Sequence, residues 1–347
     1  MARMISIDSD GARGVEQNGG RVHVRTPAYR RPAALQRCLE SLIAQSWSDW
    51  VCDVFDDDPD ESGRAVCAML DDPRIRYTAN APRMFASANI DQCFSTMNPH
   101  GADYFCVVED DNYLLPKFMQ QNIALCRTHG VDLVLRNQVV EIASGTDKAR
   151  LSDGGILDGH FTEGAYEPDL FRLILLTGIG VSNGGLFWSR NARSGLEIGH
   201  SCTATSQEYM RTFTVDEPIW VAMQPLAVWA ENGEATTRDM GDKASYLRRE
   251  LDLKHRTQRL QRQAWRLAGA ERRRDYLAQT TFTASREDRA KGLTKALLAG
   301  PRALSALPLK DAVNLTLRGA IIRLAGRSDA AFEAFLSDRR RRRAESA

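Results

Sequence analysis

Two apolar segments of this chain each run directly into a cluster of carboxylates. Trp50–Phe55 is followed by Asp56–Asp58, and Tyr104–Val108 is followed by Glu109–Asp111. The continuous apolar run Tyr104–Val108 is typical of a strand that is buried on both faces of a sheet, and Trp50–Phe55 also has the pattern of a strand. Open α/β sheets bind ligands outside the carboxyl ends of their strands, so we predict that both clusters lie at a ligand-binding edge.

The acidic clusters also indicate what kind of ligand this edge binds. Carboxylates that lie close together repel one another, so a cluster needs a cation or hydrogen-bond donors to be stable. Hard cations such as Mg²⁺ take oxygen ligands, commonly one or two carboxylates together with the phosphates of a substrate. Each cluster alone could be a solvated acidic turn. Two clusters at equivalent strand ends favour a site for a metal-bound phosphate ligand.

Strand-like and helix-like segments alternate over the first two thirds of the chain. A strand pattern at Arg21–Arg25 is followed by a helical pattern from Pro32, and further strand patterns occur at Ile75–Tyr77 and Asp132–Ile142. This order predicts an α/β fold with a mostly parallel central sheet and helices on both faces. Residues 144–170 are rich in Gly, Asp and Ser, and we expect an irregular excursion there.

Charge is divided unevenly along the chain. Over all 347 residues, 46 Lys and Arg nearly balance 45 Asp and Glu. Residues 236–347 alone contain 26 basic and 13 acidic residues, a net charge of +13, which leaves −12 for the rest. We therefore predict a disordered leader over 1–20, an α/β domain over 21–235 and a basic helical C-terminal region over 236–347.

The basic C-terminal region is open to three interpretations. One helix face carries an apolar stripe formed by Val313, Leu317, Ala320, Ile321 and Leu324. The helices could pack on the α/β domain, lie on an anionic membrane surface with this stripe inserted, or bind nucleic acid. Packing is the expectation and the membrane surface is the alternative, whereas sparse aromatic residues and the lack of a nucleic-acid motif argue against the third. The run Arg339–Arg343 is expected to be solvated.

Cysteine usage indicates a reducing compartment. The seven cysteines are scattered, are odd in number and form no Cys-x-x-Cys pair, so we expect free thiols. No apolar run is long enough to span a membrane, and residues 1–20 lack the apolar core of a signal peptide. We predict a cytoplasmic protein, either free or peripheral on the inner membrane face. The six histidines are isolated in the sequence, without zinc-ligand spacing.

Five segments, taken in order, resemble the family 2 inverting glycosyltransferases of GT-A fold. They are Val24–Arg31, Leu35–Trp50, Asp56-Asp57, Pro73–Tyr77 and the loop Glu109–Asn112 that precedes Pro116. The resemblance extends over residues 21–230. It implies a GT-A domain that moves a sugar from a nucleotide-sugar donor to a hydroxyl of a saccharide or lipid-linked acceptor, in surface polysaccharide or glycoconjugate assembly.

The resemblance implies a set of nucleotide-binding residues. By position they are Thr26, Tyr29, Asp56, Asp57, Arg83 and Asp110. Asp57 would accept a hydrogen bond from an N–H of the base, because an ionised carboxylate is a pure acceptor. Asp56 would support that loop. Arg83 would bind the diphosphate, because a guanidinium matches the geometry of phosphate oxygens.

The resemblance also implies a metal site and a base. Asp111 would bind a divalent cation, Mn²⁺ or Mg²⁺, with Glu109 opening the motif at a position where the family more often has Asp. Glu208 is the candidate general base that deprotonates the acceptor hydroxyl, and the neighbouring pair Asp216-Glu217 is a competitor. The turn Asn183–Gly185, followed by Trp188, resembles the acceptor pocket.

Two other functions remain open at this point. The chain could be a non-catalytic GT-A scaffold, since Glu109 and the incomplete acidic pair at Glu208 depart from the family pattern. It could also be a nucleotidyltransferase that makes a nucleotide-sugar, because such enzymes share the alternating fold and the metal. Release of a nucleoside diphosphate, of pyrophosphate, or of neither would distinguish the three.

Overall fold

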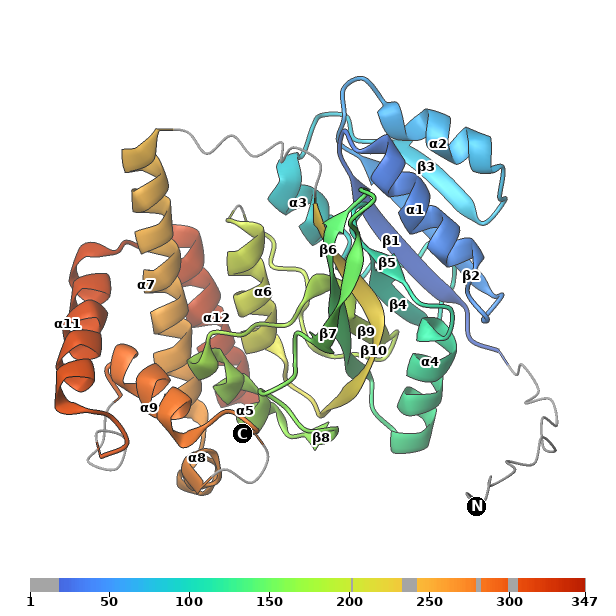
Figure 1. Ribbon diagram of the computed structural model, residues 1–347. Helices are drawn as coiled ribbons and strands as arrows, with labels where there is room; N and C mark the ends of the chain where they lie inside the picture. The colour runs from blue at the N-terminus through green and yellow to red at the C-terminus, as the bar shows by residue number, and fades with distance from the viewer. Residues whose placement is uncertain (1–18, 201, 233–241, 279–281, 299–304, 347) are drawn as a thin grey trace, which may run out of the picture.

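The computed structural model describes residues 19–200, 202–232, 242–278, 282–298 and 305–346. Most of the predicted leader, and the predicted boundary at residue 236, lie outside these residues. One extended sheet forms the centre of the molecule, and the helices of the C-terminal region gather on one side of it (Figure 1). The predicted α/β class with a mostly parallel central sheet is confirmed.

The first half of the sheet is parallel. Its strands follow the order β3-β2-β1-β4, with β1 (Val22–Ala28), β2 (Trp50–Asp56), β3 (Ile75–Ala79) and β4 (Tyr104–Val107). The pairs β1–β2, β1–β4 and β2–β3 are all parallel, so these strands end at the same edge. The two acidic clusters follow β2 and β4, on either side of β1, which places them at one edge as predicted.

The second half of the sheet mixes directions. An antiparallel strand, β9 (Leu186–Ser189), lies between β4 and β6 (Leu133–Ser144), and β10 (Ile219–Asn232) runs parallel to β6. A bulge between Ala222 and Ala227 accommodates the irregular stretch around Pro225, so β10 continues as one strand. The remaining strands are β5 (Tyr113–Leu114), β7 (Arg150–Gly155) and β8 (Gly164–Tyr166), so the predicted excursion of 144–170 contains two strands.

Helices cover both faces of the sheet. One face carries α1 (Pro32–Ile43), α2 (Ser62–Leu70) and α4 (Phe118–His129), which share a core with Val24 and Val54 of the sheet. Pro32 occupies the first turn of α1, where its missing N–H costs nothing. The other face is covered by α3 (Phe85–Gln92), α5 (Pro168–Phe171), the 3₁₀ turn η1 (Arg172–Thr177), α6 (Ala204–Thr214) and the C-terminal helices.

The C-terminal region consists of α7 (Lys243–Leu267), α8 (Ala270–Ala278), α9 (Arg286–Lys295), α11 (Leu309–Ala325) and α12 (Ala330–Ser346). Leu260, Phe332 and Leu336 of these helices share a buried core with Met210 and Phe213 of α6. The expected packing on the α/β domain is therefore confirmed. Within the described residues, none of the helices is long and apolar enough to cross a bilayer.

Two details of this region correct the sequence-based expectation. Arg339 is not a solvated member of the arginine run, because its guanidinium forms an ion pair with Asp216 at 3.1 Å. The apolar stripe of α11 does not face the core: Val313, Leu317 and Ile321 are exposed. The side of α11 that packs inward carries Ala312, Gly319 and Ile322 instead, and Gly319 allows a close approach to the neighbouring helix.

Candidate active site

The acidic loop after β2 is held rigidly by its own first carboxylate. Asp56 accepts hydrogen bonds from the backbone N–H groups of Asp58 (3.0 Å) and Gly63 (2.9 Å) and from the hydroxyl of Tyr77 (3.0 Å). A Cβ on Gly63 would lie 2.7 Å from Asp56 Oδ2, so only glycine permits this approach. The predicted supporting role of Asp56 agrees with this geometry.

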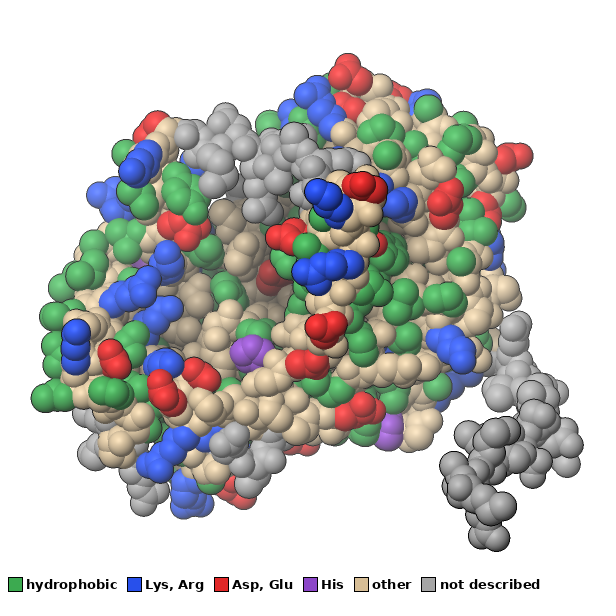
Figure 2. Space-filling view, in the orientation of Figure 1, with side chains coloured by type: hydrophobic (Ala, Val, Ile, Leu, Met, Phe, Trp, Pro, Cys, Tyr) green, Lys and Arg blue, Asp and Glu red, His purple; other side chains and the backbone are tan. Residues whose placement is uncertain are grey.

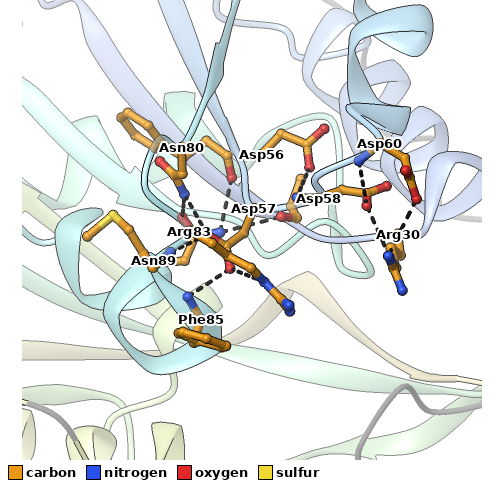
Figure 3. A network of polar contacts seen from close by, with 12 residues as sticks. Arg30, Asp56, Asp57, Asp58, Asp60, Asn80, Arg83, Phe85 and Asn89 are labelled. Carbon is orange, nitrogen blue, oxygen red and sulfur yellow. Dashed lines mark hydrogen bonds and ion pairs between the residues drawn. The ribbon is translucent and has the colours of Figure 1, made fainter.

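Asp57 binds the loop that precedes α3 (Figure 3). Its Oδ1 accepts from the N–H of Met84 at 2.6 Å, and its Oδ2 accepts from the N–H of Phe85 at 2.8 Å and from Arg83 Nε at 3.3 Å. Phe85 has a positive φ of 63°, a backbone conformation that is costly for an aromatic residue. The acceptor predicted for a base N–H is thus saturated by the chain itself, and a nucleotide would have to displace part of this loop.

Two predicted nucleotide-binding residues, Arg83 and Tyr29, are in contact. The guanidinium of Arg83 lies 4.6 Å from the ring centroid of Tyr29 and 4.8 Å from that of Phe85. Thr26 lies apart from them, because its side chain is fully buried and its hydroxyl contacts the sulfur of Cys52 at 3.5 Å. Only the backbone of Thr26 can therefore contribute to the strand edge.

Arg31 is the residue at this edge that sequence reasoning missed. Its guanidinium forms ion pairs with both Asp110 and Asp111, and its Nε lies 3.4 Å from Asp110 Oδ2. Asp110 also accepts from the backbone N–H of Tyr29 at 2.9 Å, which ties the β1–α1 loop to the β4 loop. Burial raises the pKa of Asp110, and the positive charge of Arg31 opposes that rise. One arginine thus compensates two of the three carboxylates in the cluster.

Asn183 links the third carboxylate of the cluster to α6, the helix that carries the candidate base. Its side-chain amide donates to Glu109 Oε1 at 2.9 Å, and its Oδ1 accepts from Arg211 of α6, also at 2.9 Å. Burial, together with the negative charge of Glu109, raises the pKa of Glu208 to about 8. Burial and the charge of Asp111 likewise raise the pKa of Glu109. The structure therefore brings the predicted metal loop, the predicted base and the predicted acceptor turn together.

A buried arginine supports this arrangement from behind. Arg211, in the same helix as Glu208, donates to Asn183 Oδ1 at 2.9 Å and forms an ion pair with Asp91 at 2.6 Å. Its guanidinium also lies 3.7 Å from the ring centroid of Phe94. This buried arginine fixes the orientation of the Asn183 side chain. When the amide oxygen accepts from Arg211, the amide nitrogen faces Glu109 and can donate to it.

The competing acidic pair and the predicted acceptor aromatic have structural roles. Glu217 Oε1 accepts from the backbone N–H groups of Arg193 and Ser194, both at 2.8 Å, and Asp216 pairs with Arg172 at 2.6 Å. Trp188 is buried and stacks on neighbouring core rings, with centroid distances of 5.4 and 5.8 Å. These contacts leave Glu208 as the better-placed candidate base.

The fold also assembles a histidine group that sequence spacing does not reveal. The Nε2 atoms of His23 and His100 lie 2.8 and 2.9 Å from Asp53 Oδ2. These atoms could hold a metal ion by distance. However, Arg25 Nε donates to His23 Nδ1 at 3.4 Å, so the ring proton of His23 belongs on Nε2, where it is donated to Asp53. The group is satisfied by hydrogen bonds alone.

The face shown in Figure 2 is hollowed between the helical region and the sheet, with Asp and Glu side chains inside the hollow. At the edge itself, a narrow space is lined by residues that include Tyr29, Arg31, Asp56 and Asp110. A larger cavity of about 300 Å³ opens at the opposite edge, between Arg127 and Arg190 among others, and contains none of the predicted site residues.

Comparison with known proteins agrees with this architecture. Residues 24–182 match the family described as glycosyl transferase family 2. An uncharacterized protein of Mycobacterium tuberculosis, MT1568, is 28% identical over 117 residues, which are 34% of this chain and 36% of that protein. The chain thus spans about a third of the length of this curated relative.

Solved structures share the fold at low sequence identity. TarS 1–349 of S. aureus in complex with UDP-GlcNAc superposes with a TM-score of 0.51 and 13% identity, covering 89% of this chain and 93% of that one. The same fragment in complex with UDP gives a TM-score of 0.48 and 12% identity, covering 92% and 91%. The family match covers the loops that carry both acidic clusters. Residues 24–182 therefore resemble a glycosyl transferase family 2 domain, and the chain shares the fold of TarS 1–349.

Proposed function

We propose that this enzyme transfers a sugar, with inversion at the anomeric carbon, from a nucleoside-diphosphate sugar to a hydroxyl acceptor. The single observation that supports the proposal is the nearness of Glu208 in α6 to Glu109 in the β4 loop, where burial and the negative charge of Glu109 raise the pKa of Glu208. A carboxylate of raised pKa would then stand beside the acidic cluster that we propose holds the leaving diphosphate. A base and a leaving-group site at one edge are what inverting transfer requires.

The donor would occupy the edge between the two acidic loops. Asp57 and Arg83 would contact the base and the diphosphate, and Tyr29 would lie along the nucleotide. The contacts of Asp57 to the 80–85 loop would make the site selective for nucleotides whose base carries a suitably placed N–H group. Such an N–H would have to replace that of Met84 or Phe85 as the donor to Asp57. TarS, whose fold is similar, binds UDP-GlcNAc, which makes a uridine nucleotide the first donor to test.

The residues of the β4 loop fit a hard divalent cation. Their donor set consists of carboxylate oxygens, and Asp110 and Asp111 already share one positive charge, that of Arg31. Asp111 would bind the cation directly and Glu109 would complete the motif. Such a cation would stabilise the charge on the leaving diphosphate. Arg31 would then be released from Asp111 and could face the phosphates.

Glu208 would act as the general base. Its raised pKa is close to the pH of a cell, the range in which a general base removes a proton most effectively. The positive charge of Arg211 and the N–H of Asn183 oppose the rise in the pKa of Glu208, so both favour its ionised form. We further propose that the acceptor is a saccharide or lipid-linked hydroxyl in glycoconjugate assembly, and that the protein works in a reducing compartment, where its free cysteines persist.

One assay tests the proposal against its two alternatives. The full chain is incubated with Mn²⁺ and a panel of nucleoside-diphosphate sugars and nucleoside triphosphates, and the released products are measured. Release of a nucleoside diphosphate from a nucleotide-sugar supports glycosyl transfer. Release of pyrophosphate from a triphosphate indicates nucleotidyl transfer, and binding without turnover indicates a scaffold. Either of the last two results would overturn the proposal.

A further inference from the structure

We propose that helix α11 docks the enzyme on an anionic membrane surface. A row of large apolar side chains on α11, here called the α11 ridge, faces solvent along the whole helix. Its exposed fractions are Leu309 81%, Val313 48%, Leu317 57%, Ile321 60% and Leu324 85%. Figure 2 shows hydrophobic side chains along this margin of the molecule, with Lys and Arg side chains beside them. A continuous apolar row of this kind marks an interaction site, unlike isolated exposed residues.

The orientation of α11 is fixed by the residues on its other side. Ala312, Gly319 and Ile322 are buried. A Cβ on Gly319 would lie 2.4 Å from the carbonyl oxygen of Lys295 in α9, so the two helices approach as closely as their backbones allow. Gln258 of α7 donates to that same oxygen and to the carbonyl oxygen of Gly319, each at 2.9 Å. The ridge therefore cannot rotate into the core without breaking this packing.

The charge beside the ridge is positive. Lys310, Arg318 and Arg323 of α11 are exposed, and Asp311 is the only acidic residue of the helix. Among the residues that the structure describes, these three cations form no ion pair. The surface beside the ridge thus carries positive charge that is not neutralised locally, and it is complementary to an anionic partner.

Neighbouring helices add to this positive charge. Burial and the charges of Arg318 and Lys254 lower the pKa of Lys295, and burial and the charge of Arg323 lower that of Arg262. These shifts show that cations of α7, α9 and α11 lie close enough to repel one another. A surface of anionic headgroups would relieve that repulsion, and each basic residue near such a surface adds to the attraction.

The positive charge beside the α11 ridge indicates which kind of partner the ridge binds. A second copy of the chain, packed ridge to ridge by two-fold symmetry, would bring the same cations against each other. A lipid surface instead accepts apolar side chains between its headgroups and places anionic groups beside the arginines. The α11 ridge has this amphipathic form, so an anionic bilayer is the partner that it fits.

The test uses the full chain and two kinds of vesicle, phosphatidylcholine alone and an equal mixture of phosphatidylcholine and phosphatidylglycerol. We expect the protein to sediment with the mixed vesicles and not with phosphatidylcholine. The double variant Leu317→Asp, Ile321→Asp should lower the partition coefficient about tenfold or more, and Arg318→Ala with Arg323→Ala should lower it and weaken its salt dependence. Thermal unfolding and donor turnover of each variant should match the wild type, which separates this proposal from the proposed reaction.

A matched control introduces two aspartates at exposed apolar residues outside α11. Met69 on α2 and Leu151 on β7 are also exposed apolar residues, and Met69→Asp with Leu151→Asp should leave vesicle binding unchanged. Equal binding to both vesicle types, or full binding by the Leu317→Asp, Ile321→Asp variant, would overturn the proposal. A concentration-dependent dimer that this variant abolishes, with no vesicle binding, would show instead that the ridge binds a second copy.

Discussion

Asn183 donates its side-chain amide to Glu109 at 2.9 Å, and its Oδ1 accepts from Arg211 of the helix that carries Glu208. This residue therefore spaces the acidic loop from α6, and burial raises the pKa values of both Glu109 and Glu208. The amide supplies a donor between like charges without adding charge of its own. This spacing is the feature of the site on which the predicted base most depends.

Replacing this donor with an acceptor should shift the pH dependence of the reaction. In Asn183→Asp, a third carboxylate would face Glu109, and repulsion would raise the pKa of Glu208 further. We expect the pH–rate profile to move to higher pH and turnover at neutral pH to fall by about tenfold or more.

The matched control is Asn191→Asp on the surface, for which the pH–rate profile should be that of the wild type. An unshifted profile in Asn183→Asp would show that Glu208 is not the base.

Glu208→Gln should separate catalysis from stability. Turnover should fall by about 100-fold or more, because the amide cannot accept the proton of the acceptor. In the wild type the folded pKa of Glu208 lies near 8, above its ordinary 4.5, so ionisation of this side chain costs stability as pH rises between those values. The variant lacks this cost. Urea unfolding should show a stability gain for Glu208→Gln that is absent at low pH and largest above pH 8.

The ion pairs of Arg31 lead to a prediction on metal binding. In Arg31→Met, Asp110 and Asp111 lose the guanidinium that they share. The cluster should therefore bind Mn²⁺ about tenfold more tightly in the absence of nucleotide. This factor corresponds to about 1.4 kcal/mol, the free energy by which the ion pairs with Arg31 would otherwise oppose metal binding. Titration calorimetry with MnCl₂ measures this. Arg64→Met, which removes an exposed arginine on α2, is the control. Weaker Mn²⁺ binding in Arg31→Met would contradict the competition.

Asp111→Ala should abolish the metal dependence of donor binding. The alanine removes the proposed direct ligand and leaves Asp110 paired with Arg31. Calorimetry with a nucleoside-diphosphate sugar, with and without Mn²⁺, should then give the same affinity in both conditions. An affinity for the donor that still rises with Mn²⁺ would refute the role of Asp111.

Position along the sheet explains how much of this site the sequence could predict. Asp56, Asp57 and the cluster Glu109–Asp111 follow strands, and parallel strands end at one edge, so order along the chain was enough to bring them together. Arg31 was missed because its partners lie about 80 residues away and no local pattern marks them. The histidine group around Asp53 escaped notice for the same reason.

Two side-chain orientations, those of Thr26 and of the apolar stripe on α11, show a different limit of prediction from sequence. Thr26 lies on the same face of β1 as Val22 and Val24, but every residue of this strand is buried, so its burial follows from the central position of β1 in the sheet. The stripe of α11 was identified correctly as one face, yet hydrophobicity alone does not say which face is buried. Gly319 decides it, because close contact with α9 needs the small residue and not the large ones.

The core shared by α6, α7 and α12 has a consequence for how this protein can be divided. The family match ends at residue 182, before α6, and Met210 and Phe213 of that helix pack against Leu260, Phe332 and Leu336. A fragment cut at the limit of the match would keep the residues that we propose bind the nucleotide and lose Glu208, the proposed base. A fragment cut after β10 would keep Glu208 on a helix stripped of its apolar cover. We therefore expect that a fragment must include the basic C-terminal helices if Glu208 is to keep its position.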